Sequence, residues 1–224
     1  MNRRTFLAFP IASAALPRLS AASAVLARIP ASGVEPGEPK TIDFKSNVPG
    51  TGTFPAKWIC GSPSCMDNRD PAIQVHWYNE HTVFLRQNKA WNYEAPFMHL
   101  YFGNRRILFI DEGYTQLRTD WPLRDVVDGC INDWCRRNGR DPEEMELLLS
   151  FTHLHDDHYA AINQFYDRPN TRYMGITHEE MIGFWGMTNY PDECVTLDLG
   201  GREILIWGNP GHVISEFAYY DAYT

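Results

Sequence analysis

The chain has 224 residues, of which 44% are hydrophobic, 13% aromatic and 21% charged. This is the profile of a globular protein with enough apolar material for a sizeable core, and the seven Trp argue against disorder. Its 20 basic and 28 acidic residues give a net charge of −8. Such acidity argues against a nucleic-acid partner, because phosphate contacts need clustered Lys and Arg.

Residues 1–28 are expected to form a signal peptide. Arg3 and Arg4 precede a run of small and apolar residues, and an A-x-A cleavage sequence stands at 22–24. The adjacent arginines resemble a twin-arginine export signal. An uncleaved membrane anchor is the alternative, but prolines end the apolar run well short of the roughly 20 residues that a span needs. We therefore expect a periplasmic or secreted protein without a stable membrane anchor.

The rest of the chain divides into a lead-in at 29–55, rich in Pro, Gly and Ser, and one folded domain at 56–224. Strands are expected at 73–77, 82–86, 97–102, 106–110, 146–151, 195–199, 203–207 and 217–223, and helices at 122–138 and 159–166. Gly200 and Gly201 predict a hairpin turn, since both tolerate positive φ. The nearly continuous apolar run at 146–151 predicts a strand buried on both faces. Strands alternating with helices around this central strand indicate an α/β class.

Five cysteines leave at least one thiol outside any intramolecular pair. Cys60 and Cys65 flank a short turn that could bring them into a disulfide. Cys130 and Cys135 fall within the expected helix at 122–138, where residues five apart point in different directions. They are expected to be small buried hydrophobes.

A dense histidine cluster follows the apolar strand. His153 and His155 point to the same side of an extended backbone, because side chains alternate with period two, so both can reach one cation. Asp157 and His158 lie at the following bend and can reach the same hollow. Imidazoles with a carboxylate suit zinc or a similar transition ion. An exposed histidine-rich turn is the alternative, and the core strand that leads into the cluster argues against it.

A second element, at 208–212, again follows an expected strand. Its Gly and Pro make a tight turn that presents His212 at the strand end, where a third imidazole could complete the ligands of one ion.

These residues resemble the metallo-β-lactamase-fold hydrolase superfamily. Its H-x-H-x-D-H signature matches residues 153–158, its P-G-H element matches 210–212, and a strand ending in L-I-D-x-G matches 108–113. The resemblance spans roughly 93–223. It implies a four-layer αββα sandwich with a metal site at one edge of two sheets.

The resemblance also implies roles. His153, His155 and His212 would hold one metal, and Asp157 and His158 would help to hold a second, so that one or two zinc or other divalent ions are expected. Asp157 would also be catalytic, orienting the nucleophile and moving a proton. Asp111, with Thr152, would support the ligand imidazoles through hydrogen bonds. The alternative role for Asp111 is that of a turn residue.

The superfamily usually supplies a later aspartate that bridges two metals and a final histidine. Asp221 follows His212 too soon to be the bridge. One expectation is therefore a chain incomplete at its C-terminus, whose reading frame continues past Thr224, and the alternative is a complete chain with one metal site or none.

The expected function is an exported metal-dependent hydrolase that acts on an ester, thioester, lactone, β-lactam or phosphoester bond of a small molecule. The alternative is a catalytically inactive metal-binding module or subunit, and a third option is a redox protein using iron. The remaining histidines are expected to be structural or at the surface: His76, His81, His99 and His178. Trp185, Met187 and Tyr190 are expected either in the core or at a substrate mouth. The sequence leaves the oligomeric state open.

Overall fold

The computed structural model describes residues 38–46, 50–60 and 66–224. The expected signal peptide and the Cys65 end of the expected disulfide lie outside these residues. The chain divides into two units, Met1–Ser32 and Gly33–Thr224, and the described residues all lie in the second.

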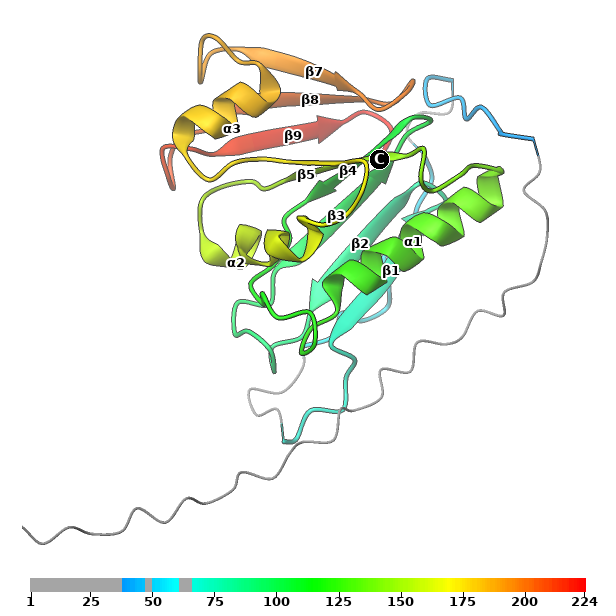
Figure 1. Ribbon diagram of the computed structural model, residues 1–224, viewed down its shortest axis with the longest axis vertical. Coiled ribbons are helices and arrows are strands. Elements are labelled where there is room, and N and C mark those ends of the chain that lie inside the picture. The colour runs from blue at the N-terminus through cyan, green and yellow to red at the C-terminus, as the bar shows by residue number, and fades with distance from the viewer. Residues whose placement is uncertain (1–37, 47–49, 61–65) are drawn as a thin grey trace, which may run out of the picture. The chain divides into compact units, whose positions relative to one another are not determined.

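The described part of the second unit contains nine strands, three α-helices and one 3₁₀ helix (Figure 1). In chain order they are β1 (Ile73–Asn79), β2 (Thr82–Gln87), β3 (Phe97–Phe102), β4 (Arg106–Ile110), α1 (Leu123–Asn138), β5 (Glu146–Ser150), α2 (Asp156–Tyr159), η1 (Ala160–Phe165), β6 (Thr171–Tyr173), α3 (His178–Trp185), β7 (Cys194–Asp198), β8 (Glu203–Gly208) and β9 (Phe217–Asp221). All the expected strands are present, with ends that differ by at most two residues.

The strands form two sheets. The large sheet has the order β1-β2-β3-β4-β5-β6 and the small sheet the order β7-β8-β9. Neighbours in the large sheet are antiparallel from β1 to β4 and parallel from β4 to β6. The hairpin expected between β7 and β8 is confirmed, with φ values of 100° at Gly200 and 87° at Gly201.

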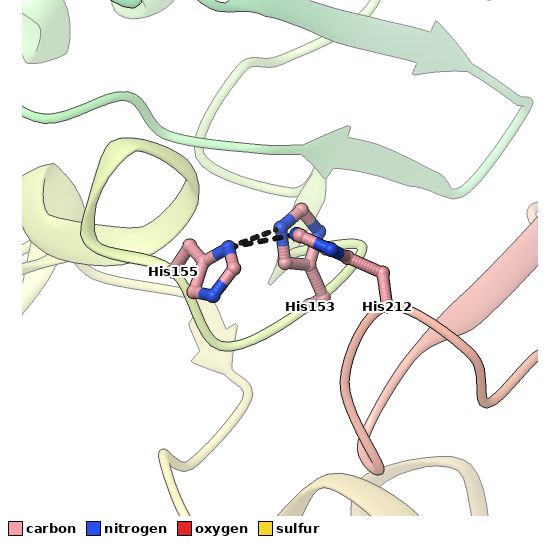
Figure 2. A group of neighbouring side chains, drawn as sticks. All are labelled: His153, His155 and His212. Atoms are coloured by element: carbon pink, nitrogen blue, oxygen red, sulfur yellow. Dashed lines mark hydrogen bonds between the residues drawn. The ribbon is translucent and has the colours of Figure 1, made fainter.

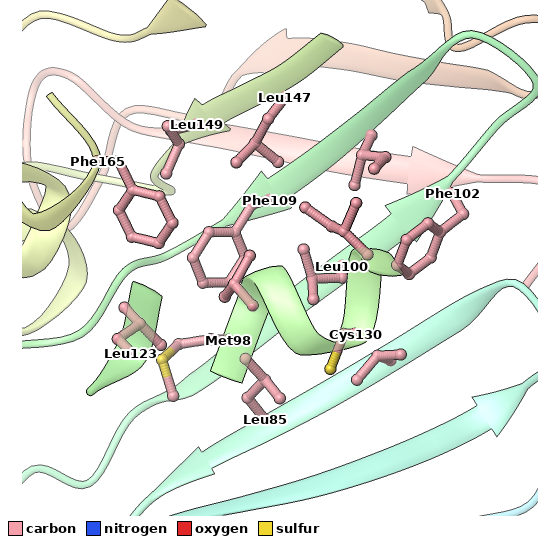
Figure 3. Packing of buried hydrophobic residues seen from close by; sticks show 14 of the residues in the cluster. Leu85, Met98, Leu100, Phe102, Phe109, Leu123, Cys130, Leu147, Leu149 and Phe165 are labelled. Carbon is pink, nitrogen blue, oxygen red and sulfur yellow. The ribbon is translucent and has the colours of Figure 1, made fainter. Parts of the chain in front are cut away.

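Helix α1 covers one face of the large sheet. Its buried positions recur at steps of three and four residues and pack on alternate side chains of the strands below (Figure 3). Each such Leu, Val or Ile contributes about 1.5–3 kcal/mol when fully buried. The helix ends where Gly139 takes a left-handed φ of 64°.

The other face of the large sheet packs against the small sheet. Leu147 and Leu149 of β5 belong to the core under α1, whereas Leu148 between them is 1% exposed and belongs to the core between the sheets. The expectation that this strand is buried on both faces is confirmed. Met181 and Trp185 of α3 also enter this second core.

The α/β class is thus confirmed, with a helix on one face of a large sheet and a small sheet on the other (Figure 1). A further helical layer on the outside of the small sheet, the fourth layer of the expected sandwich, stays a prediction.

The expected helix at 159–166 differs in kind from the observed structure. α2 begins earlier and makes a single turn, and the chain then continues as 3₁₀ helix η1. The backbone N–H of Ala161 donates to the carbonyl of Gly113 at 3.1 Å, so it is engaged outside the helix. Ile162 and Phe165, three residues apart, are both buried, which suits the threefold 3₁₀ period.

The buried thiols behave as small hydrophobes, as expected. Cys130 is 6% exposed and Cys135 fully buried, and neither forms a disulfide. Burial raises the pKa of each thiol to about 12. No helix among the described residues is long and apolar enough to cross a bilayer.

The strand ends place the functional residues. β4 and β5 run parallel, and their carboxyl ends meet where Asp111 N donates to Ser150 O at 2.8 Å. The segment after β5 then pairs with the segment before β9, because Phe217 N donates to Thr152 O at 2.8 Å and His153 forms an isolated bridge with Glu216. Residues from both sheets therefore meet at one edge.

Candidate metal centre

Three histidine side chains from two distant segments meet at this edge (Figure 2). Nε2 of His153 lies 3.1 Å from Nδ1 of His155. Nε2 of His212 lies 3.0 Å from the same Nδ1 atom. One ligand nitrogen from each ring lies within 4.8 Å of the other two. His153 is partly buried and the other two are exposed, so solutes can reach the three rings.

The local backbone explains why His153 and His155 converge. His155 is extended, with φ −116° and ψ 142°, and stands just before α2. The intervening Leu154 packs at the margin of the core between the sheets. The period-two alternation expected from the sequence therefore places both imidazoles on one side.

His212 reaches the others from the loop between β8 and β9. Within this loop Glu216 Oε2 accepts from His212 N at 3.2 Å, and Asn209 N donates to Glu216 O at 2.8 Å. The hydroxyl of Tyr190 donates to the carbonyl of Ile214 at 2.6 Å. The loop that carries His212 is thus held by hydrogen bonds within the loop and by Tyr190, which lies in the segment that follows α3.

A second contact fixes the same loop. Nδ1 of His178, at the start of α3, lies 2.7 Å from Oγ of Ser215. The ring of His178 also packs edge-on against Tyr190, at 5.1 Å between centroids. The expectation that His178 is structural agrees with this position. The sequence gives no signal for its partner, because 37 residues separate His178 from Ser215.

Thr152 and Asp111 support the centre from below. Asp111 is 4% exposed, has a left-handed φ of 62°, and accepts hydrogen bonds from Thr152 N at 2.8 Å and Thr152 Oγ1 at 3.1 Å. Since the hydroxyl proton goes to Asp111, Thr152 Oγ1 can accept from Nδ1 of His153, 3.0 Å away. That bond leaves the lone pair of His153 on Nε2, the atom that faces the other two histidines.

Asp111 therefore combines the two roles considered for it, support and turn residue. It supports the imidazoles through Thr152, and its backbone makes the turn after β4.

His158 lies beside the three histidines and not among them. Its ring centroid is 4.1 Å from that of His153. Its Nδ1 is 3.0 Å from Asp111 Oδ2, and its Nε2 is 3.3 Å from Asp157 Oδ2. Burial opposes the charged ring, but the hydrogen bond and charge of Asp111 outweigh it, so the pKa of His158 is raised.

The pKa of His153 moves the other way. Burial comes first among the causes, followed by the neighbouring His158 and His155, and together they lower the pKa of His153. A neutral imidazole is the form that binds metal ions.

An open cavity of about 650 Å³ lies over these groups. Its described lining is formed by Glu94, His153, Leu154, His155, Asp156, Asp157, His158 and His212. All five residues expected at the site therefore line one cavity. Glu94 was missed, because it comes from the loop between β2 and β3, and a single exposed acid in a loop carries no sequence signal.

The other residues that were expected to be structural lie outside the lining of this cavity. His81 is 7% exposed and accepts from Trp134 Nε1 at 3.1 Å. His76 Nε2 lies 2.5 Å from Thr53 O. Trp185 and Met187 are buried in the core between the sheets, which agrees with the first of the two positions expected for them, the core.

The three converging imidazoles fit a transition ion. Zinc–nitrogen bonds of about 2.0–2.1 Å in a tetrahedral site place neighbouring nitrogens about 3.3 Å apart. The observed separations of 3.1 and 3.0 Å are close to that value. A neutral imidazole has one N–H, so Nδ1 of His155 cannot donate to both neighbours, whereas three lone pairs can share one cation. His153, His155 and His212 could therefore hold a metal.

No protein-family model matches the chain, and no curated protein is significantly similar to it in sequence. Solved structures do resemble it. The metallo-β-lactamase DIM-1 is 16% identical, with 69% of this chain and 67% of that chain covered and a TM-score of 0.43. The metallo-β-lactamase FEZ-1 from Legionella gormanii is 14% identical, with 62% and 54% covered and a TM-score of 0.41.

A flavo di-iron protein from Thermotoga maritima is 14% identical, with 69% of this chain and 40% of that chain covered and a TM-score of 0.43. This chain spans 66% of TMB-1, which is 15% identical with a TM-score of 0.42. TM-scores in this range do not assign a function, so the residues of the site must carry that assignment.

Proposed function

We propose that this chain is a metal-dependent hydrolase of the metallo-β-lactamase-fold superfamily, and that His153, His155 and His212 hold one transition-metal ion. The observation that carries the proposal is the convergence of three imidazole nitrogens within 4.8 Å, although His155 and His212 are 57 residues apart. The H-x-H-x-D-H and P-G-H motifs that supply these histidines support the family assignment. A bound divalent ion would activate water and polarise the bond under attack.

The surrounding residues have separate tasks. Thr152 keeps the lone pair of His153 on Nε2, through the hydrogen bond described above. Asp157 orients the attacking water and takes its proton, the catalytic role that the motif implies. Its partner His158, 3.3 Å away, holds that carboxylate in place.

Zinc is our first choice of metal, because imidazole ligands suit it. A second ion would use Asp157 and His158, which now contact each other. Counting bound metal in the purified protein by mass spectrometry decides between one ion and two. Replacing Asp157 and His158 should abolish binding of the second ion and leave binding of the first ion intact.

The substrate is a small molecule with an ester, thioester, lactone, β-lactam or phosphoester bond, and nucleic acid is not a partner. The test is a panel of chromogenic compounds of these classes, incubated with zinc-loaded protein. We expect turnover of at least one class, and a loss of kcat of about 100-fold or more in Asp157→Asn. A zinc-loaded protein that hydrolyses no member of the panel would overturn the proposal.

One observation favours a second candidate, a metal-binding module without activity. Asp221, the first aspartate in sequence after His212, forms an ion pair with Arg202 at 2.6 Å, and its side chain is 9% exposed. It is therefore engaged elsewhere and cannot bridge two ions. One tightly bound ion without hydrolysis would support this candidate, and hydrolysis would exclude it.

We also propose that the protein is exported through the twin-arginine signal at its N-terminus. The support is the sequence of residues 1–28 alone. Replacing Arg3 and Arg4 by lysine should retain a tagged protein inside the cell, as fractionation would show. Equal export of both forms would contradict the proposal.

A further inference from the structure

The walls of the cavity carry one sign of charge. Beside four imidazoles and one leucine, its described lining has three carboxylates, those of Glu94, Asp156 and Asp157, and neither Lys nor Arg. Asp157 contacts His158. Glu94 and Asp156 have no part in the proposed ligand set, so their charges face whatever enters the cavity.

Glu94 stands on a loop that is held firmly. Asn88, at the loop's start, is fully buried and its Nδ2 donates to Pro71 O and Asn68 Oδ1, both at 2.9 Å. The loop closes where Gln87 N donates to Pro96 O at 3.1 Å. The position of Glu94 at the cavity is therefore set by the fold.

Further contacts fix the tip of this loop. Glu94 N donates to Asn92 Oδ1 at 2.9 Å. Ala95, next to Glu94, is fully buried with a left-handed φ of 46°. Lys89, a cation of the same loop, has its Nζ over the ring of Tyr93, 5.4 Å from the centroid, and is not part of the described lining.

Glu94 lines the same cavity as His153, His155 and His212, so its charge acts on groups that enter this cavity. An opposite charge a few ångströms away is attracted across a protein surface, and a like charge is repelled by the same amount.

We propose that Glu94 is a specificity-determining residue that selects substrates bearing a cationic group, such as an ammonium, close to the bond that is cleaved. This inference rests on the proposed metal site, and it names the class of substrate that the site takes. A substrate with a carboxylate at the same place would meet Glu94 and Asp156 instead of a cation.

Three small thiols test the proposal without requiring turnover. 2-Aminoethanethiol, 2-mercaptoethanol and 3-mercaptopropionate share a two-carbon spacer and end in a positive, neutral and negative group. Each can ligate cobalt through sulfur, and the thiolate-to-cobalt absorption band of the cobalt-loaded full chain reports its Kd. We expect the order of affinity to be ammonium, hydroxyl, carboxylate, with a preference that weakens at high salt.

The variant Glu94→Gln should reduce the ratio between the Kd values of the negative and positive thiols by about tenfold. Cobalt affinity itself should stay within about twofold of the wild type, because Glu94 is not one of the three proposed metal ligands. Glu144→Gln is the matched control. It removes an equal charge from an exposed residue before β5, at the end of that strand away from the histidines, and should leave the ratio unchanged.

The outcomes separate the two proposals. Failure of cobalt to bind would overturn the proposed metal site and this inference with it. Cobalt binding with equal affinity for the three thiols, or with the same preference in Glu94→Gln, would overturn the inference alone. A large loss of cobalt affinity in Glu94→Gln would make Glu94 a metal ligand and also overturn its role as a charge selector.

Discussion

Nε2 of His212 lies 3.0 Å from Nδ1 of His155, although one residue follows the small sheet's β8 and the other the large sheet's β5. Each imidazole alone is exposed and could turn into solvent. Their approach depends on the pairing of the two sheets at this edge, where Phe217 N donates to Thr152 O at 2.8 Å. The centre is therefore a product of the tertiary structure.

Asp111→Asn should weaken the centre without unfolding the protein. The substitution removes the carboxylate charge 3.0 Å from His158 Nδ1 and weakens the acceptor for Thr152. The pKa of His158 should fall, as NMR titration of the metal-free protein would show. Zinc affinity should fall about 10- to 100-fold. Asp120→Asn, at an exposed position, is the control, and equal zinc affinity in both variants would contradict the prediction.

Tyr190→Phe should loosen the loop that carries His212. The hydroxyl donates to Ile214 O at 2.6 Å and accepts from Glu216 N at 3.2 Å, and each bond contributes roughly 0.5–1.5 kcal/mol. We expect zinc affinity to fall about tenfold, with a small change in Tm. Tyr166→Phe removes a hydroxyl from an exposed ring as the control. Unchanged zinc affinity in Tyr190→Phe would show that the loop holds its shape without this contact.

Acid should destabilise the fold through His81. Burial lowers the pKa of His81 to about 4, from 6.5 in the unfolded chain, and Nδ1 accepts from Trp134 only in the neutral ring. Since the unfolded state binds the proton more tightly, this contribution is present above pH 6.5 and is lost as the pH falls toward about 4. The loss should approach about 3 kcal/mol.

Urea unfolding at a series of pH values measures this loss. A His81→Phe variant should lack this part of the pH dependence, whatever its absolute stability. The same slope in wild type and variant would assign the acid sensitivity to other groups.

Arg202→Met should be strongly destabilising. The side chain of Arg202 is fully buried, pairs with Asp221 at 2.6 Å, and lies over the rings of Tyr101 and Tyr223 at 5.1 and 4.9 Å. Its loss leaves a buried carboxylate unpaired, at a cost of about 3–5 kcal/mol in unfolding free energy. Arg202→Met combined with Asp221→Asn should recover part of that loss. Purely additive effects in chemical denaturation would contradict the pairing.

The sequence predicts the parts of the molecule that depend on local periodicity. The nearly continuous apolar run at 146–151 identifies β5 as buried on both faces, and the three- and four-residue spacing ending at Gly139 identifies α1. The spacing of His153 and His155 likewise places both on one side of an extended segment. These features need only neighbouring residues, so they can be read along the chain.

Features that depend on distant partners cannot be read in this way. Glu94, from the loop after β2, lines the cavity beside residues 153–158, which follow β5 in the chain, and no motif marks it. The contact of His178 with Ser215 depends on how α3 meets the loop after β8. The split of the expected helix at 159–166 follows from the hydrogen bond between Ala161 and Gly113, which joins segments nearly fifty residues apart.

The most direct test of the central claim is a crystal structure of the zinc-loaded protein with an anomalous difference map at the zinc edge. We expect a zinc ion about 2.0–2.2 Å from Nε2 of His153, Nδ1 of His155 and Nε2 of His212. A map without zinc at these three nitrogens, at saturating metal, would contradict the account.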